Sequence, residues 1–293
     1  PSMMPYTTER RISKNTLIKI ASFVQILSYH KTGKGEYLFA ILQLFSQMWG
    51  KTYKTRLPFS FNTTIIKVRF GGICMFTTVL FDLDGTLLNT LDDLADSANR
   101  VCAAHGWAQH TKDEYRYFVG NGIPKLVERF SPETARDPDT LAATLAEFGA
   151  VYGAHMHDKT APYPGMPELL HNLRQNGVKM AVFSNKADEF AGAVVERYFG
   201  KGLFEIVRGA LPDVPTKPAP EGTRALMRSL GVDPAADKIL YVGDSNVDVQ
   251  TAHNAGLPCC GVLWGFRTRG ELEQEGAEYL AADCKELEEI ILR

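Results

Sequence analysis

The sequence has few cysteines, and their shortage excludes two classes of protein. Its 293 residues include five cysteines, with no CxxC pair and no histidine at metal-ligand spacing. Neither a disulfide framework nor a zinc site is therefore predicted. Cys259 and Cys260 lie in an apolar run, where free cysteine behaves as a small hydrophobic residue rather than a reactive thiol. A reducing cytoplasm fits this cysteine usage best.

Long apolar runs are also absent. The two clearest apolar stretches, at 16–28 and 37–49, have about 13 residues each, whereas a membrane-spanning helix needs about 20. No membrane span is predicted. The chain has no internal repeat and no low-complexity segment, and its composition, 45% hydrophobic and 23% charged, is that of a globular protein. Its length suits a domain with an insertion.

The charge is unevenly distributed along the chain. Residues 1–74 contain eleven Lys or Arg and two acids, whereas residues 75–293 contain 21 basic and 32 acidic residues. The acidic part argues against nucleic-acid binding, because phosphate backbones select basic surfaces. We interpret residues 1–74 as an extension outside the fold, because Met75 opens the first predicted strand. An organelle-targeting leader and a helix for a membrane surface or a partner are the alternatives.

From residue 75 onward, short apolar runs alternate with helical patterns. Strands are expected at 77–81, 178–183, 204–207, 238–242 and 258–263, and helices at 167–176, 186–198, 220–230, 247–255 and 267–275. This alternation predicts an α/β fold, a doubly wound, Rossmann-like and mostly parallel sheet with helices on both faces. No pattern indicates an oligomeric state.

One interval breaks the alternation. Its patterns are all helical, at 91–105, 112–118, 123–130 and 140–152, so an all-helical cap subdomain is inserted after the first strand. Pro162-Tyr163-Pro164-Gly165 marks the return to the sheet, since proline and glycine punctuate such junctions. The predicted domains are the extension at 1–74, the α/β core at 75–91 and 160–293, and the cap at 92–159.

Polar side chains follow the predicted strands at their carboxyl ends, where open α/β sheets bind ligands. Asp82 and Asp84 end the first strand in the motif DLDGT, and two such carboxylates suit a nucleophile and a proton donor acting on one phosphate. A capped turn is the alternative. Ser184 and Asn185 follow the second core strand and offer a hydroxyl and a backbone N–H to a phosphate oxygen. The same two residues are equally typical of a helix N-cap.

Two further motifs complete this set. Lys217 lies in a proline-flanked loop, where a fixed cation neutralises phosphate, although an isolated Lys-Pro is commonly a solvated turn. Asp244 and Asp248, four residues apart at a strand-to-helix junction, suit a hard cation such as Mg²⁺. Helix N-capping by Asp244 or Ser245 is the alternative. Because all four motifs follow strands in one order, we predict a magnesium-dependent phosphatase for a small-molecule phosphate.

With these motifs, residues from about 75 to 292 resemble the haloacid dehalogenase-like superfamily of phosphatases. The resemblance extends to its phosphoglycolate phosphatase branch through five further stretches. These are Asp92-Asp93-Leu94, Val119-Gly120-Asn121-Gly122, Pro162-Tyr163-Pro164-Gly165, Ser184-Asn185-Lys186 and Trp264-Gly265-Phe266. No catalytic motif departs from the family's pattern. The extension at 1–74 does, since relatives usually begin near the position of Met75.

The resemblance implies a role for each site residue. Asp82 would be the nucleophile that forms an aspartyl phosphate, and Asp84 the general acid and then the base that activates water. The Asp82 carboxylate and the Asp84 backbone carbonyl would hold Mg²⁺. The remaining roles would be metal binding by Asp244 with support from Asp248, and phosphoryl binding by Ser184 and Lys217.

The implied reaction is hydrolysis of 2-phosphoglycolate to glycolate and phosphate. Another small-phosphate phosphatase, a pyrophosphatase and a sugar phosphomutase on the same scaffold remain alternatives. The intact pair Asp82 and Asp84 argues against a non-catalytic binding module.

The cap would choose the leaving group by closing over the sheet. Gly120 and Gly122 are expected to shape the cap loop nearest the substrate, with a plain turn as the alternative. A substrate carboxylate requires a cation nearby. The candidates are Arg116, Lys125, Arg129 and Lys186, each of which is otherwise a solvated surface charge.

Overall fold

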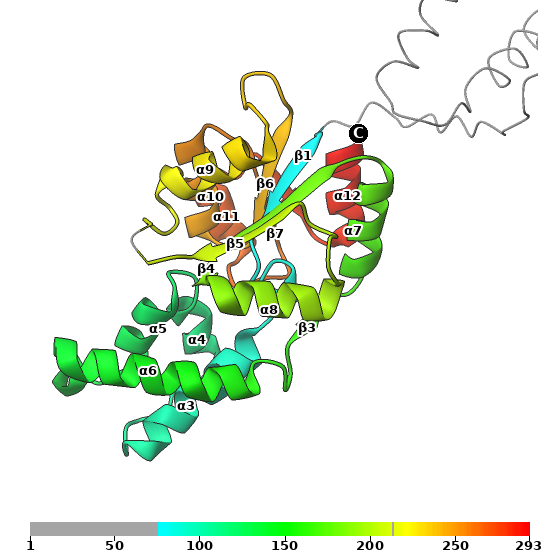
Figure 1. Cartoon of the computed structure of the whole chain (residues 1–293). Coiled ribbons are helices and arrows are strands. Elements are labelled where there is room, and N and C mark those ends of the chain that lie inside the picture. Colours follow the sequence, from blue (N-terminus) through cyan, green and yellow to red (C-terminus); the bar gives the residue numbers. More distant parts are fainter. Residues whose placement is uncertain (1–75, 213) are drawn as a thin grey trace, which may run out of the picture. The chain divides into compact units, whose positions relative to one another are not determined.

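The computed structural model describes residues 76–212 and 214–293. The predicted extension at 1–74, its targeting and membrane alternatives, and the domain start at Met75 lie outside the described residues. Figure 1 shows the described part as a twisted sheet flanked by helices, with a further group of helices beyond one end of the sheet.

The main sheet has six strands within the described residues, and all of its pairings are parallel. In spatial order they are β5 (Ile206–Ala210), β4 (Lys179–Ala187), β1 (Thr78–Phe81), β6 (Ile239–Gly243), β7 (Cys259–Val262) and β8 (Tyr279–Ala281). The chain runs from β1 to β4 and β5 on one side, then crosses to β6, β7 and β8 on the other. This reversal makes the carboxyl end of β1 a switch point, where doubly wound sheets bind ligands.

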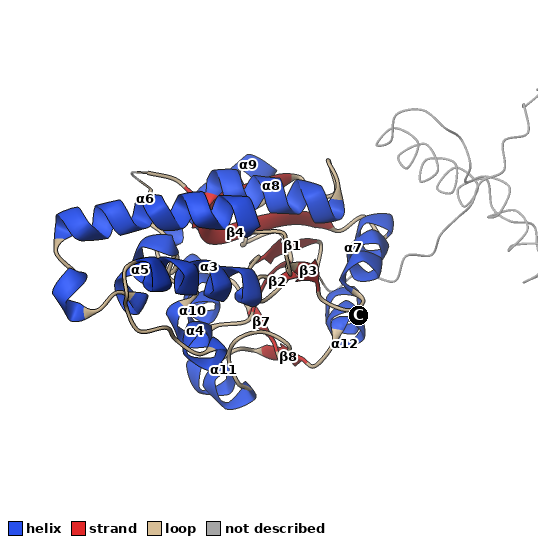
Figure 2. Cartoon of the chain, turned by 90° about the horizontal axis from the view of Figure 1, so that it is seen from below, coloured by secondary structure: helices blue, strands red, loops and turns tan. Residues whose placement is uncertain are grey.

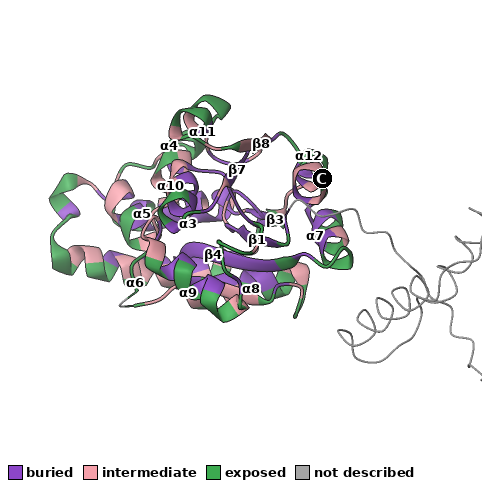
Figure 3. Ribbon diagram, turned by 90° about the horizontal axis from the view of Figure 1, so that it is seen from above, coloured by how far each residue is buried: buried purple, intermediate pink, exposed green. Residues whose placement is uncertain are grey.

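Both faces of the sheet are covered. Along β1, the side chains of Val79 and Phe81 join one apolar cluster and Leu80 joins another, as expected for a strand buried on both faces. The first cluster includes α7 (Met166–Gln175), α8 (Asp188–Phe199) and α12 (Cys284–Leu292). The second includes α9 (Pro220–Leu230), α10 (Asn246–Ala255) and α11 (Arg269–Glu275). Figure 3 shows the buried strands between these helices. The doubly wound α/β prediction is confirmed.

Cys259 and Cys260 are side by side on β7, and both are fully buried. Burial raises the pKa of the Cys260 thiol to about 12, so this thiol is not a reactive one. The four cysteines in the described residues are all free and buried. The expected role of Cys259 and Cys260 as small hydrophobic residues is therefore confirmed.

The inserted helices form a separate group, here called the cap (residues 91–155). They are α3 (Leu91–Ala104), α4 (Lys112–Phe118), α5 (Ile123–Phe130), a 3₁₀ turn (Glu133–Ala135) and α6 (Pro138–His155). Figure 2 shows this group beside the carboxyl ends of the central strands. The all-helical cap is confirmed, while the domain boundaries at 92 and 159 stay a prediction.

The chain enters and leaves the cap through a short antiparallel pair, β2 (Leu88–Asn89) and β3 (Ala161–Pro162). Asp93, near the start of α3, is buried and ties the two connections together. Its carboxylate accepts hydrogen bonds from the backbone N–H groups of Lys159 and Thr160, at 2.8 Å each, and from the Thr160 hydroxyl at 2.7 Å. These bonds to a charged acceptor fix the base of the cap.

Several element bounds differ from the prediction. β4 continues to Ala187, so residues 184–186 are buried strand and the alternative of a helix N-cap at Ser184 and Asn185 is wrong. Helix α8 begins at Asp188. β5 begins two residues later than expected, at Ile206. The strands β2, β3 and β8 were not predicted, because two or three residues carry no detectable alternation. The unpredicted α12 has a readable start signal, since the Asp283 side chain accepts from the Glu286 N–H.

Across residues 76–212 and 214–293, no helix is both long and apolar enough to cross a membrane.

Candidate active site

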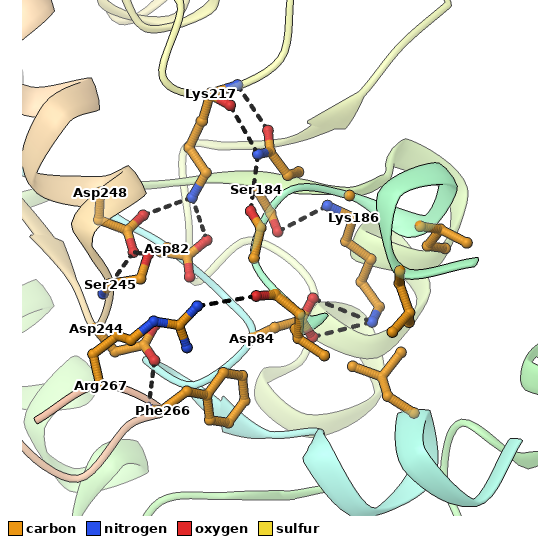
Figure 4. A pocket seen from close by; sticks show the side chains of 17 residues that line it. Asp82, Asp84, Ser184, Lys186, Lys217, Asp244, Ser245, Asp248, Phe266 and Arg267 are labelled. Atoms are coloured by element: carbon orange, nitrogen blue, oxygen red, sulfur yellow. Dashed lines mark hydrogen bonds and ion pairs between the residues drawn. The ribbon is translucent and has the colours of Figure 1, made fainter. Parts of the chain in front are cut away.

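A single pocket beyond the carboxyl ends of the central strands contains the predicted site. All ten site residues named from the sequence line this pocket, where cap and core meet. They are Asp82, Asp84, Gly120, Gly122, Ser184, Asn185, Lys186, Lys217, Asp244 and Asp248. The core residues come from the loops after β1 and β6, the end of β4, the loop before α9 and the first turn of α10. Figure 4 shows the labelled side chains of Asp82, Lys217 and Asp248 pointing toward one another.

Three carboxylates and one ammonium group form the floor of the pocket. Asp82, Asp244 and Asp248 each offer an oxygen within 4.8 Å of the others, and all three residues are buried. Lys217 Nζ donates to Asp82 Oδ1 at 2.6 Å and to Asp248 Oδ1 at 2.7 Å. Lys217 is 4% exposed, so it does not lie in a solvated turn.

The charges on this floor do not balance. Burial raises the pKa of Asp244 to about 7, and the negative charge of Asp248 adds to the rise. Burial and Asp248 likewise raise the pKa of Asp82 well above its usual value. Burial alone would lower the pKa of Lys217, but Asp248 and Asp82 outweigh it and raise that pKa. One ammonium therefore faces three carboxylates, and the excess negative charge on clustered oxygens fits a divalent cation.

Asp244 is held from two sides. Its Oδ2 accepts the Phe266 N–H at 2.7 Å, and its Oδ1 accepts the Thr86 hydroxyl at 3.4 Å. Two glycines make room for it: a Cβ at Gly85 would lie 2.4 Å from Asp244 Oδ2, and one at Gly265 would lie 2.2 Å from Asp244 Cβ. Gly85 also has a φ of +91°, which disfavours other residues. This explains the glycine in DLDGT.

Asp248 takes part in a helix cap as well as in the cluster. Its Oδ2 accepts the backbone N–H of Ser245 at 3.1 Å and the Ser245 hydroxyl at 2.7 Å, at the start of α10. Its other oxygen faces Lys217. The capping alternative and the site prediction are therefore both compatible with the geometry, because one carboxylate has two oxygens.

Asn185 joins the Lys217 loop to the cap. Its Oδ1 accepts the Lys217 N–H at 2.8 Å, and its Nδ2 donates to the carbonyls of Lys217 at 3.1 Å and Gly120 at 3.0 Å. Gly120 and Gly122 therefore lie beside the core, as expected for the cap loop nearest the substrate. Ser184 is buried, and its Oγ accepts the Lys186 N–H at 3.2 Å.

Lys186 is buried in the pocket wall and is already paired with a carboxylate. Its side chain is 1% exposed, and its Nζ donates to Asp84 Oδ1 at 3.0 Å and to the Tyr152 hydroxyl at 2.6 Å. Burial would lower the pKa of Lys186, but Asp84 and Tyr152 raise it. The alternative that Lys186 is a solvated surface charge is therefore wrong, while its role in binding a substrate stays a prediction.

The three other predicted cations lie outside the pocket lining. Lys125 pairs with Glu128 at 2.7 Å on the surface. Arg129 donates to the carbonyls of Tyr117 and Phe118, and Arg116 has a side chain that is 41% exposed.

Two residues in this site were missed by sequence reasoning. Arg267 lines the pocket and follows Trp264-Gly265-Phe266 directly, so that motif was the available signal. Tyr152, which is fully buried, lies on the cap helix α6 and reaches Lys186 in the core. No sequence signal distinguished it from an ordinary core aromatic residue.

The chain belongs to the haloacid dehalogenase-like hydrolase family, since that family's model matches residues 79–262. The phosphoglycolate phosphatase of Pseudomonas putida is 34% identical over 213 residues, which are 71% of this chain and 77% of that protein. The phosphoglycolate phosphatase of Vibrio parahaemolyticus is 30% identical over 220 residues, 73% of this chain and 95% of that protein. The chain is thus a phosphatase of the phosphoglycolate phosphatase branch, as its motifs indicated.

Solved structures share this fold. A structure described as a predicted phosphoglycolate phosphatase from Haemophilus somnus has a TM-score of 0.68 and 29% identity, and the match covers 75% of this chain and 99% of that one. CbbY from Rhodobacter sphaeroides, solved in complex with phosphate, has a TM-score of 0.62 and 26% identity, and the match covers 72% and 96%.

Proposed function

We propose that this chain is a Mg²⁺-dependent 2-phosphoglycolate phosphatase that acts through an aspartyl phosphate on Asp82. The observation that carries the proposal is the buried floor of the pocket, where Asp82 lies against Lys217 and two further carboxylates. The names of the relatives support the choice of substrate. The charge excess on the floor supports the divalent cation.

In the first half of the proposed reaction, an Asp82 carboxylate oxygen attacks phosphorus and the bond from phosphorus to the ester oxygen breaks. Asp84 gives its proton to that departing oxygen, which leaves as the glycolate hydroxyl. Lys217 neutralises the phosphoryl oxygens, and the Ser184 hydroxyl and the Asn185 N–H bind them.

In the second half, water attacks the phosphorus of the aspartyl phosphate. Asp84 accepts a proton from that water, and Asp82 departs as a carboxylate, so the enzyme returns to its starting state. Mg²⁺ would be held by the carboxylates of Asp82, Asp244 and Asp248 and by the Asp84 backbone carbonyl, and it would supply charge neutralisation at a phosphoryl oxygen.

A substrate panel tests the proposal. The chain 1–293 is assayed with Mg²⁺ on 2-phosphoglycolate, simple alkyl phosphates, sugar phosphates, a sugar bisphosphate and pyrophosphate. The proposal expects the highest kcat/KM with 2-phosphoglycolate, and EDTA should abolish turnover. Similar efficiency on many substrates, or activity on none, contradicts the assignment. Phosphoryl exchange between sugar positions without net hydrolysis would instead identify a phosphomutase.

The nucleophile is tested separately. Asp82→Asn should lower kcat by at least about 10³-fold and abolish the aspartyl phosphate trapped from 2-phosphoglycolate after rapid acid quenching. Asp233→Asn is a matched control, because Asp233 lies in an exposed turn away from the pocket. Retained turnover in Asp82→Asn rules out its role as nucleophile.

A further inference from the structure

Arg267 occupies a position in the pocket unlike that of the other cations. Lys186, Lys217 and Arg267 are the cations in the pocket lining. The two lysines are bonded to carboxylates, whereas Arg267 makes no ion pair with any described residue. Figure 4 shows its guanidinium pointing toward the interior of the pocket. It is therefore the pocket cation whose charge is not already matched by a paired carboxylate.

The backbone that carries Arg267 is fixed to the floor of the site. Trp264 Nε1 donates to the Thr86 carbonyl at 3.0 Å, and the Phe266 N–H donates to Asp244 at 2.7 Å. Gly265 packs so closely on Asp244 that a side chain there has no room. The Arg267 main chain is thus held in a fixed position relative to Asp244, which is proposed to bind the metal.

The side chain of Arg267 crosses from the core to the cap and keeps donors available. Its Nη1 donates to the Arg116 carbonyl, its Nη2 donates to the Val119 carbonyl at 3.4 Å, and the guanidinium lies over the Tyr117 ring at 4.8 Å from the ring centroid. A guanidinium has five N–H donors. The two bonds to the cap therefore orient the group and leave other donors for a ligand.

The cap itself adds no charged group to the pocket. Its lining residues are apolar side chains and glycines, namely Leu94, Val119, Gly120, Gly122, Ile123 and Leu126. A second anionic group on the substrate would be costly against such a wall unless it met a cation. The described residues offer Arg267, and a guanidinium binds a carboxylate through two parallel hydrogen bonds.

We infer that Arg267 binds the carboxylate of the substrate and thereby makes the enzyme select organic phosphates that bear a carboxylate next to the phosphate ester. This inference rests on the proposed function, because it assigns the recognition of the leaving group in that reaction. Arg267 replaces the four cations suggested by the sequence, and it belongs to the core rather than to the cap.

The test compares two phosphates of similar size. 2-Phosphoglycolate has a carboxylate at the position where ethyl phosphate has a methyl group. The ratio of their kcat/KM values therefore measures recognition of the carboxylate. In the chain 1–293 with Mg²⁺, Arg267→Gln should lower kcat/KM for 2-phosphoglycolate by about 10- to 100-fold, mainly through KM, because hydrogen bonds to a charged group are lost. Ethyl phosphate should change by less than about threefold. Arg267→Lys should retain part of the preference for 2-phosphoglycolate, because lysine keeps the positive charge but lacks the planar pair of N–H donors.

Arg116→Gln is the matched control. Arg116 also bonds across the interface, to the Gly265 carbonyl at 3.4 Å, but it does not line the pocket. The inference expects the substrate ratio to stay unchanged in this variant. Thermal unfolding of all variants checks that each one folds.

The outcomes separate the inference from the proposed function. An equal loss on both phosphates in Arg267→Gln means that Arg267 only links cap and core, which overturns the inference alone. A preference for 2-phosphoglycolate that survives in Arg267→Gln overturns it too. A wild-type chain that shows no preference for 2-phosphoglycolate, or hydrolyses neither phosphate, contradicts the proposed function and the inference together.

Discussion

The charge imbalance on the pocket floor predicts that the metal-free protein loses stability as pH rises through neutrality. In the folded chain Asp244 has a pKa of about 7, raised by burial and by Asp248. In the unfolded chain an aspartate has an ordinary pKa of about 4. At pH 6 the folded state therefore binds a proton at Asp244 that the unfolded state does not, so the free energy of unfolding must fall as pH increases.

The size of the effect follows from the titration. From pH 6 to pH 8, Asp244 in the folded state changes from mostly protonated to mostly ionised, while in the unfolded chain it stays ionised. Releasing about one proton over this interval lowers the free energy of unfolding by on the order of 1 kcal/mol. Asp82, whose pKa is also raised, changes stability in the same direction. The raised pKa of Lys217 has no effect here, because it remains charged in both states below about pH 10.

Urea unfolding at pH 6 and pH 8 measures this difference. With EDTA, the wild-type chain should lose stability relative to Asp244→Asn between the two pH values, and the subtraction removes the contribution of histidines elsewhere. With millimolar Mg²⁺, the stabilisation should be larger at pH 8, because a cation binds the ionised carboxylates. Equal pH dependence in the two chains, or equal stabilisation by Mg²⁺ at both pH values, would refute the reasoning.

Two further substitutions test the neighbouring contacts. Tyr152→Phe removes the hydroxyl oxygen that accepts a hydrogen bond from buried Lys186. The free energy of unfolding should fall by about 1–3 kcal/mol, and kcat should fall about tenfold with little change in KM. Tyr115→Phe is the control: its hydroxyl bonds only inside the cap, so kcat should stay unchanged. Gly85→Ala places a Cβ against a carboxylate of the proposed metal site and should weaken Mg²⁺ binding about 10- to 100-fold in calorimetry. Gly106→Ala has a similarly positive φ with open space around it, so it should lose about 1–2 kcal/mol of stability without a change in Mg²⁺ affinity.

The floor of the site could be predicted because each of its residues has a local signal. Asp82 and Asp244 directly follow buried apolar runs, and the carboxyl ends of parallel strands meet at one edge of the sheet. The helix α9 was predicted with its observed bounds, since Pro220 opens it and Gly231 ends it in the left-handed conformation. Such signals come from residues that are close together in the sequence, so they can be recognised without a structure.

The cations of the leaving-group side could not be predicted in this way. Lys186 lies in the carboxyl-terminal end of β4 and Arg267 lies in the segment after β7, but the roles of both depend on which carboxylates they meet. Asp84 lies 102 positions from Lys186 in the sequence, and it is the carboxylate with which Lys186 is paired. Arg267 is left without such a partner by the same packing. Whether a cation is paired or free therefore depends on contacts between segments that are distant in the sequence. Composition and motif spacing do not predict such contacts.

Among the described residues, three of the contacts between the cap and the core lie beside groups with a proposed role in catalysis or substrate binding. Tyr152 bonds Lys186, which holds Asp84, and the carbonyl of Gly120 bonds Asn185, which holds the Lys217 loop. The third contact is Arg267, through its bonds to cap carbonyls. An opened cap would therefore lose bonds to the supports of the general acid and the phosphate cation at once. In this structure the cap therefore helps to position the groups that the proposed reaction uses, and it also forms one wall of the pocket.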